Sequence, residues 1–341
     1  MPILDKLTNF VKQIMPLSLV TGASGFVGSH LAEELVRRGY RVHCLVRKSS
    51  NLNWLVEAGV EFVFGDIQDK GALKKILVDY EYIFHTAGLI KSRDPARFHQ
   101  VNHQGTKNLL EAAWENHLPL KRFVYISSLA ASGPSLNGRP KKETDFCHPI
   151  SVYGQSKLAG EKETFRFADR FPVTAIRPPG IYGPRDRQLL GIFKIAQWGI
   201  MPILGAGESQ FSIIHVKDLV NGIILAAESP QAIGRTYFMT DGLSYTWLEA
   251  GKILAEVQGK KFRNLIIPKW VLSILASGAD LIAKLSGKSF YLTQRKIKEL
   301  DYKVWACDSS KARQELGFRP EYDFRTGARD TIEWYKQHNW I

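Results

Sequence analysis

Short apolar runs alternate with amphipathic segments along the first half of the chain. Runs of four to six residues, bounded by glycine or polar residues, are typical of buried parallel strands, and they occur at 17–20, 41–46, 61–65, 82–86 and 123–126. Helical periodicity is clearest at 29–38, 102–114 and 153–167. This alternation predicts an α/β fold, a Rossmann-type doubly wound parallel sheet. At 341 residues the chain exceeds what one core usually organises, so a smaller companion domain is expected.

Two further apolar segments lie outside this alternation. Residues 1–15 place apolar side chains at helical spacing and predict an amphipathic helix, which packs on the body, on a partner subunit in a homodimer, or on a membrane. Leu265–Gly287 is interrupted by Lys269, Asp280 and Lys284, so it falls short of a transmembrane span. It is expected to form a wall of the substrate pocket or core, with peripheral membrane contact as the alternative.

Composition narrows the choice of partners. The net charge is +13 and the pI is about 9.5, which favours an anionic partner such as a dinucleotide, an acidic substrate or an anionic membrane surface. The basic residues are dispersed, so we expect no nucleic acid partner. Cys44, Cys147 and Cys307 show no metal or disulfide spacing, and the N-terminus lacks a basic leader. We therefore expect a cytoplasmic protein, with membrane association as the open alternative.

A glycine-rich loop follows the first apolar run. Gly22, Gly25 and Gly28 are spaced three apart between that run and a helical segment. Glycine lets a backbone turn tightly and approach a pyrophosphate, which the free N–H groups of the helix N-terminus then bind. The loop therefore predicts a dinucleotide site that includes Gly22, Ser24, Gly25, Phe26, Val27 and Gly28.

The end of the second predicted strand bears on the choice of dinucleotide. An NAD site usually carries an acidic residue there to bind the ribose hydroxyls. This chain has Val46 followed by Arg47 and Lys48, which suit a 2′-phosphate, so NADP is favoured over NAD. Other candidates at strand ends are Asp66 and Ile67 beside the adenine, Ala87 and Gly88 where the backbone passes the cofactor, and Ser127 and Ser128 after the fifth strand.

A tyrosine and a lysine stand one helical turn apart at Tyr153 and Lys157. A phenol with a pKa of about 10 is a poor base at neutral pH, but a nearby ammonium favours its phenolate. Tyr153 can then exchange a proton with a substrate oxygen to which Ser128 donates a hydrogen bond.

With these residues in place, the chain resembles the extended short-chain dehydrogenase/reductase superfamily, the NAD-dependent epimerase/dehydratase family. The matching motifs are TGASGFVG at 21–28, GDIQD at 65–69, VNHQGTKN at 101–108, YISSLAASGP at 125–134, YGQSK at 153–157 and RPPGIYGP at 177–184. SSLAASGP and the closing LGFRP at 316–320 are most similar to the branch of 3β-hydroxysteroid dehydrogenases and dihydroflavonol reductases.

The resemblance implies roles for individual residues. Ser128, Tyr153 and Lys157 would be the catalytic triad, with Asn102 supporting the Lys157 side. Pro178, Gly180 and Ile181 would line the nicotinamide, and Ser127 would contact the cofactor. It also implies a dinucleotide-binding domain at 16–182 with 211–240 returning to it, and a discontinuous C-terminal substrate domain at 183–210 and 241–341. Candidates for substrate contacts are Lys91, Arg93, Tyr182 and Arg185.

Two departures from the superfamily restrict the chemistry. Dehydratases of the superfamily carry Thr-Asp-Glu where this chain has Ser128-Leu129-Ala130, so dehydration is disfavoured. Sugar epimerases usually place an arginine where this chain has Phe211, which favours an apolar substrate. The predicted function is an NADP(H)-dependent oxidoreductase acting on a ketone or secondary alcohol of a small molecule. The alternatives are a nucleotide-sugar epimerase and a non-catalytic NADP-binding protein.

Overall fold

The computed structural model describes residues 15–204, 207–267, 270–271, 274, 277–278 and 302–341. Its centre is a seven-stranded sheet with the order β11-β6-β5-β4-β1-β2-β3, and every pair in it is parallel. The strands are β1 (Leu17–Thr21), β2 (Arg41–Val46), β3 (Glu61–Phe64), β4 (Tyr82–His85), β5 (Arg122–Ile126), β6 (Val173–Arg177) and β11 (Arg235–Phe238). The predicted doubly wound Rossmann-type sheet is confirmed.

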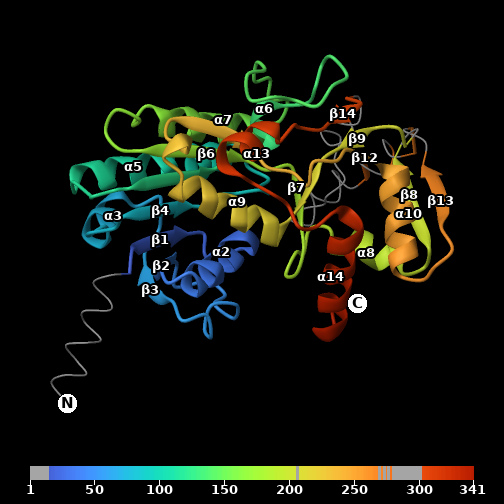
Figure 1. Ribbon diagram of the computed structural model, residues 1–341, viewed down its shortest axis with the longest axis horizontal. Coiled ribbons are helices and arrows are strands. Elements are labelled where there is room, and N and C mark those ends of the chain that lie inside the picture. The colour runs from blue at the N-terminus through green and yellow to red at the C-terminus, as the bar shows by residue number, and fades with distance from the viewer. Residues whose placement is uncertain (1–14, 205–206, 268–269, 272–273, 275–276, 279–301) are drawn as a thin grey trace.

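Helices cover both faces of this sheet (Figure 1). One face packs under α2 (Phe26–Arg37) and α9 (Val216–Glu228), and the other under α3 (Lys70–Ile76), α5 (Gly105–Glu115) and α7 (Val152–Phe165). Successive strand residues supply the two layers, since Val20 lies in the first core cluster and Leu19 in the second. The central strands β5 and β6 are buried throughout, which is why they read as continuous apolar runs.

A smaller body with its own core joins the sheet. Its apolar cluster includes Phe193, Met201, Leu254, Ile332 and Tyr335, all buried. Its elements are α8 (Leu190–Ala196), α10 (Trp247–Val257) and α14 (Phe324–Gln337), the paired strands β8 (Ile200–Leu204) and β13 (Arg263–Ile267), and a sheet of β9 (Gln210–Phe211), β12 (Tyr245–Thr246) and β14 (Val304–Trp305).

The remaining described elements are short. They are α4 (Pro95–His99), a π turn at Gln100–Gln104, α6 (Leu129–Ser132), β7 (Gly180–Tyr182), β10 (Ile213–His215), a 3-10 turn at Pro230–Ala232 and α13 (Ser310–Leu316). Strands β7 and β10 pair with each other in parallel.

Several predicted segments differ in detail. Helix α2 begins at Phe26 rather than Ser29 because Gly25 is its N-cap, and the helix predicted at 102–114 opens with the π turn. Within 211–240, which is expected to return to the dinucleotide-binding domain, α9 packs on the main sheet and β11 pairs in it, whereas β9 and β10 join the smaller sheets. Leu265 lies in strand β13. The helix predicted at 1–15 and most of 268–287 fall outside the described residues.

Within the described residues, no helix combines the length and the apolar character needed to cross a bilayer.

Candidate active site

The glycine loop between β1 and α2 lies against the end of β4. Gly22 has a φ of +70°, and a Cβ atom there would lie 2.6 Å from backbone atoms of Ala87. A Cβ atom on Gly28 would lie 2.3 Å from the carbonyl oxygen of Gly22. The Gly25 N–H closes the turn by donating to the same oxygen at 2.9 Å. Two of the three glycines are therefore required by close backbone packing, as the sequence predicts.

The N-terminus of α2 is left open toward this loop. Gly25 is the N-cap, no side chain caps the helix, and its first turn contains no acidic residue. Ser24, Phe26 and Val27 are half-buried around it. An uncapped N-terminus with free N–H groups and no competing carboxylate suits a pyrophosphate. The residues present therefore fit the dinucleotide that the fold implies.

Substituting Gly28 by alanine tests this packing. The added methyl group must push the loop or α2, so we expect the free energy of unfolding to fall by about 1–3 kcal/mol. Losing one phosphate hydrogen bond of about 1.5 kcal/mol would weaken cofactor affinity about tenfold. Urea unfolding and cofactor titration measure the two effects. Gly191→Ala is the matched control, because a Cβ atom there would meet nothing within 4 Å. Unchanged affinity and stability in Gly28→Ala would contradict the packing argument.

Two turns flank the adenine side of the predicted site. Arg47 and Lys48 are exposed after β2, in a turn closed by Ser50, whose N–H donates to the Arg47 carbonyl at 2.9 Å. The Ser50 hydroxyl accepts from the Arg47 N–H at 3.0 Å. This turn presents both basic side chains to solvent at the carboxyl edge of the sheet.

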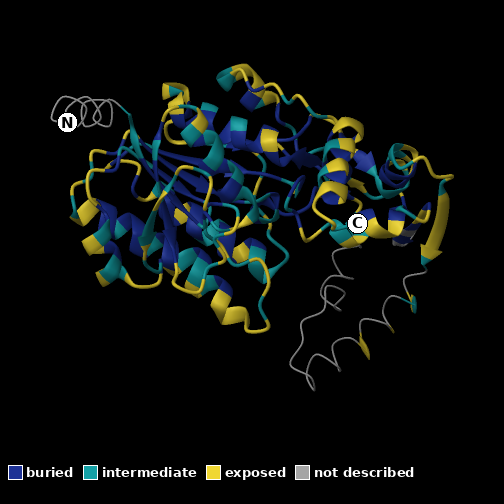
Figure 2. Ribbon diagram, turned by 90° about the horizontal axis from the view of Figure 1, so that it is seen from below, coloured by how far each residue is buried: buried dark blue, intermediate teal, exposed yellow. Residues whose placement is uncertain are grey.

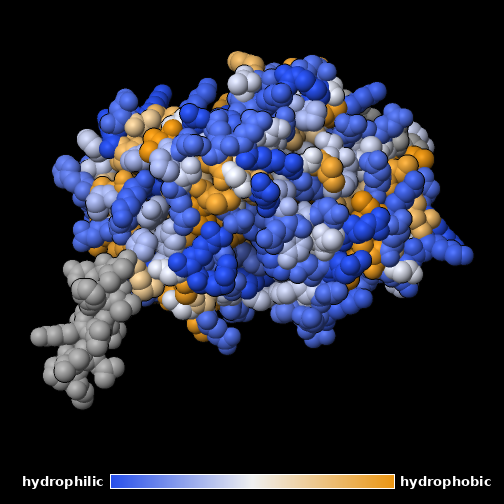
Figure 3. Space-filling view, in the orientation of Figure 1, coloured by the Kyte–Doolittle hydropathy of each residue, from blue (hydrophilic) through white to orange (hydrophobic). Residues whose placement is uncertain are grey.

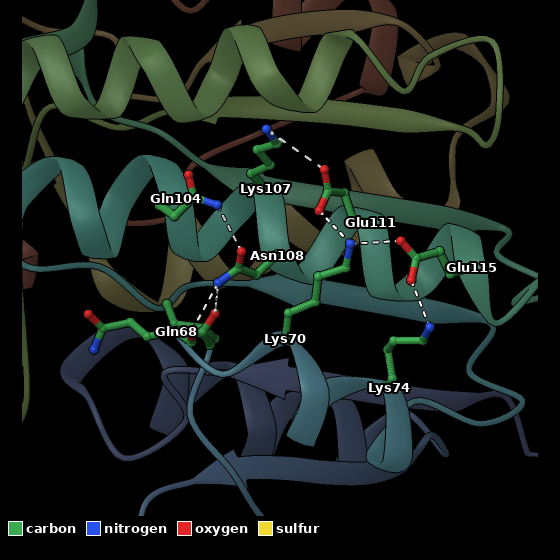
Figure 4. Close-up of polar contacts among 9 residues, drawn as sticks. Gln68, Lys70, Lys74, Gln104, Lys107, Asn108, Glu111 and Glu115 are labelled. Carbon is green, nitrogen blue, oxygen red and sulfur yellow. Dashed lines mark hydrogen bonds and ion pairs between the residues drawn. The ribbon is translucent and has the colours of Figure 1, made fainter.

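The second turn follows β3 and is held by hydrogen bonds from Asn108 of α5. The Asn108 side-chain amide donates to the carbonyls of Ile67 and Gln68, at 3.1 Å each, and accepts from Gln104 at 2.9 Å (Figure 4). The Asp66 carboxylate accepts from the Gln68 N–H at 2.9 Å. Asp66 and Ile67 are thus fixed at the strand end where the sequence places them.

Asn102 ties the loop after β4 to α7. Its side chain accepts from the Leu89 N–H at 2.6 Å, donates to the Leu89 carbonyl at 3.0 Å, and donates to the Ser156 hydroxyl at 2.9 Å. Ser156 in turn donates to the Tyr153 carbonyl at 2.7 Å. The loop carrying Ala87 and Gly88 is therefore held at a set distance from the helix that carries the tyrosine and lysine.

The three predicted catalytic residues come from two neighbouring segments. Ser128 follows β5 and caps α6, and its hydroxyl accepts from the Ala130 N–H at 3.1 Å. Tyr153, on α7, is half-buried, with its ring edge-on to Phe98. Burial raises the pKa of Tyr153, and a hydrogen bond with Ser128 opposes that rise. The structure therefore brings Ser128 and Tyr153 together.

Lys157 is buried one turn further along α7. Its Nζ atom lies 4.4 Å from the centre of the Tyr125 ring and 3.6 Å from where a Cβ atom on Gly88 would be. Burial lowers the pKa of Lys157 to about 7, while the charge of Glu161 acts in the other direction. The sequence predicts that Lys157 lowers the pKa of Tyr153, but in the structure burial is the largest influence on the pKa of each group.

The segments predicted to line the nicotinamide adjoin the end of β5. The Ser127 hydroxyl is buried and has no hydrogen-bond partner among the described residues, and an unpartnered buried hydroxyl suits a bound ligand. The Leu129 N–H donates to the Pro178 carbonyl at 2.8 Å and so joins the two segments. Gly180 is exposed and Ile181 is half-buried, both in β7.

Two of the predicted substrate contacts are engaged elsewhere. Tyr182 is fully buried in the core of the smaller body, where its hydroxyl donates to the Asp323 carbonyl at 3.1 Å. Arg185 forms an ion pair with Glu33 of α2 at 2.6 Å. The structure does not bring these two residues to the site, whereas Lys91 and Arg93 are exposed beyond the loop held by Asn102.

A buried ion pair behind the site was not predicted. Arg177, at the end of β6, donates to both carboxylate oxygens of Glu161 on α7, at 2.5 and 2.9 Å, and also to the Cys147 sulfur at 3.2 Å. The sequence offered one sign of this ion pair, since Glu161 lies one helical turn after Lys157. Arg177 in β6 is distant in sequence, and nothing in the local pattern identified it as the partner.

Comparisons with known proteins bear on the family of this chain. The family model described as the NAD dependent epimerase/dehydratase family matches residues 18–239. The chain is 32% identical over 327 residues to a ceramide reductase of Caulobacter vibrioides, covering 94% of this chain and 95% of that protein. It is 28% identical over 346 residues to a decarboxylating sterol-4-alpha-carboxylate 3-dehydrogenase of Candida albicans, covering 94% and 97%.

A solved structure extends the comparison to a third activity. The UDP-glucose 4-epimerase of Thermotoga maritima, determined with UDP-glucose, superposes with a TM-score of 0.78 at 26% identity, covering 95% of this chain and 99% of that one. A reductase, a dehydrogenase and an epimerase are therefore among the proteins that this chain resembles.

Proposed function

Because this chain belongs to the NAD dependent epimerase/dehydratase family, as its motifs predict, we propose that it is an NADP(H)-dependent oxidoreductase that interconverts a ketone and a secondary alcohol. The observation that carries the proposal is the proximity of Ser128 to Tyr153, close enough to influence the Tyr153 pKa, with buried Lys157 one turn along the same helix. The site combines a proton donor, an orienting hydroxyl and a cation beside an open phosphate-binding helix.

Each of these residues has a defined task in the proposed reaction. The bound nicotinamide supplies the hydride in reduction and accepts it in oxidation. The Tyr153 hydroxyl donates its proton to the ketone oxygen in reduction and accepts the alcohol proton in oxidation. Ser128 donates a hydrogen bond to the same oxygen, and the Lys157 ammonium favours the phenolate and binds a cofactor hydroxyl.

An apolar substrate is favoured by the wall of the smaller body. The Phe211 ring packs on Trp247, with 4.7 Å between ring centres, in place of a cation that would bind a diphosphate. A ceramide reductase and a sterol dehydrogenase, both named for lipid substrates, are among the relatives. We therefore propose a hydrophobic ketone or secondary alcohol, of the steroid, flavonoid or lipid type, as the substrate class.

A substrate screen tests the proposed function. Ketosteroids, dihydroflavonols, ceramides and UDP-sugars are incubated with the protein and each reduced or oxidised cofactor, and the absorbance of the reduced nicotinamide is followed. We expect net cofactor turnover with an apolar compound and none with UDP-sugars. Conversion of a UDP-sugar to its epimer without net cofactor turnover would instead support an epimerase, the second candidate, which the Thermotoga maritima structure favours.

Cofactor choice is tested at Arg47. A charge-assisted contact with a 2′-phosphate is worth about 1.5–3 kcal/mol, so we expect about a ten- to hundredfold preference for NADP(H) over NAD(H). Arg47→Ala should remove most of that preference, and titration of both cofactors into both proteins measures it. Arg319→Ala, another exposed arginine, is the control. Equal wild-type affinities, or an unchanged ratio in Arg47→Ala, would show that Arg47 does not read the phosphate.

A further inference from the structure

The outer end of the smaller body exposes a group of large apolar side chains. The most exposed is Trp198, in the turn between α8 and β8, with 80% of its surface accessible. Leu265 and Ile266 of β13 are 55% and 56% exposed. The full set, here called the outer patch, is Ile195, Trp198, Ile200, Leu265, Ile266, Trp270 and Ile274. In Figure 3 orange surface gathers at the end of the molecule that carries α8, α10 and β13.

The geometry of β13 explains why its apolar side chains remain in contact with solvent. The strand pairs only with β8, in a two-stranded parallel sheet, within the described residues. Because successive side chains of a strand point to opposite faces, exposure of both Leu265 and Ile266 means that none of the described residues covers either face there. Four of the five residues of β13 are exposed, and the strand lies at the margin of the molecule (Figure 2). An apolar strand left this open in water is unusual unless something covers it.

Trp198 and β13 form one continuous surface. The Arg263 N–H donates to the Gly199 carbonyl at 2.7 Å, which joins the Trp198 turn to the start of the strand. A Cβ atom on Gly199 would lie 2.4 Å from the Lys261 carbonyl oxygen and 3.4 Å from the Lys260 Cβ atom. The turn that carries Trp198 therefore lies against the backbone segment of Lys260, Lys261 and Arg263.

The charged residues in the two sequence stretches that carry the outer patch are all basic. The sequence contains no aspartate or glutamate at 187–207 or at 257–279. Both stretches contain exposed basic residues, Lys194 in the first and Lys260, Lys261 and Arg263 in the second. In the part of the chain that the structure describes, none of these four side chains forms an ion pair. Their charge is therefore available to an anionic partner.

We propose that the outer patch docks this protein on the surface of an anionic lipid bilayer. Tryptophan and aliphatic side chains enter the headgroup region, while flanking lysine and arginine side chains contact the anionic lipids. A second copy of the chain is disfavoured as the occupant, because a symmetric contact through this patch would place two sets of like charges against each other.

This docking does not depend on the proposed redox function. The binding is therefore measured on the full chain without cofactor or substrate, by co-sedimentation with vesicles. One set contains phosphatidylcholine with about one third phosphatidylglycerol, and the other contains phosphatidylcholine alone. We expect binding to the anionic vesicles, much weaker binding to the neutral ones, and release when the ionic strength is raised to about 0.5 M.

Variants assign the binding to the outer patch. A basic residue near an anionic surface contributes about 1 kcal/mol, or about fivefold, so the double variant Lys260→Gln/Lys261→Gln should bind about 25-fold more weakly. Trp198→Ser should also weaken binding. Phe146→Ser is the apolar control, since Phe146 is 85% exposed and lies outside the patch. Lys75→Gln/Lys336→Gln is the charge control, and both controls should bind like wild type.

Two results would overturn the proposal. The first is wild-type vesicle binding in Trp198→Ser and in the double lysine variant, which would place the contact elsewhere on the chain. The second is a wild-type dimer that does not bind vesicles and becomes a monomer in Trp198→Ser, as measured by sedimentation velocity. That result would make the outer patch an interface between copies of the chain.

Discussion

Replacing Tyr153 by phenylalanine is expected to lower kcat by about 10²–10⁴-fold, the range that a positioned proton donor contributes. The substitution removes only the hydroxyl that pairs with Ser128, while the ring keeps its packing against Phe98. The glycine loop and the turn at Arg47 are untouched, so cofactor affinity should stay within a few-fold of wild type. Steady-state kinetics and cofactor titration measure the two quantities on the substrate found in the screen.

The control for this prediction is Tyr322→Phe, which removes a hydroxyl that accepts a hydrogen bond from Lys217 and lies outside the candidate site. It should leave kcat unchanged. Wild-type turnover in Tyr153→Phe would remove Tyr153 from the role of proton donor. A large loss of cofactor affinity in that variant would show instead that the tyrosine acts mainly in binding.

The parallel sheet could be predicted because strands that are buried on both faces are continuous apolar runs in the sequence. Strand β2 has the predicted bounds, Arg41–Val46, and β5 differs from its prediction by one residue. The glycine loop was predictable for a related reason. Gly22 and Gly28 contact backbone that a side chain would displace, so their residue type is dictated locally.

Contacts between side chains that lie far apart in the sequence could not be predicted in the same way. The sequence near Arg185 does not identify its ion-pair partner, but the fold places Glu33 of α2 beside it. Tyr182 lies within the RPPGIYGP motif that is predicted to line the nicotinamide, yet its side chain is buried in the core of the smaller body. Residues 265–267 have an apolar composition that is compatible with several structures. They form a strand because they pair with β8. Each outcome depends on a partner that the local sequence does not contain.

The buried pair of Glu161 and Arg177 joins the catalytic helix to the sheet. Both side chains are almost fully buried, and two hydrogen bonds connect them. One buried nitrogen of the guanidinium, Nη1, has no hydrogen-bond partner in the part of the chain that the structure describes. Because α7 carries Tyr153 and Lys157, this pair holds the helix of the two predicted catalytic residues against β6. Glu161 also supplies the charge that opposes the burial effect on the pKa of Lys157.

Glu161→Gln is therefore expected to destabilise the protein by about 3–5 kcal/mol, because it leaves the Arg177 charge buried and uncompensated. Urea unfolding at neutral pH measures the change. Loss of the carboxylate should also lower the pKa of Lys157 further, so the pH above which Lys157 loses its charge moves down. Activity at neutral pH should then fall more than at lower pH, where a larger share of the lysine is protonated.

Two companion variants separate the buried pair from ordinary surface charge. Glu111→Gln removes a partly exposed carboxylate that pairs with Lys70 and should cost less than about 1 kcal/mol. The double variant Glu161→Leu/Arg177→Met removes both buried charges and should be more stable than Glu161→Gln alone, since no unpaired charge remains in the core. If Glu161→Gln unfolds at the wild-type urea concentration, the carboxylate does not compensate Arg177, and the pair cannot be what holds α7 against β6.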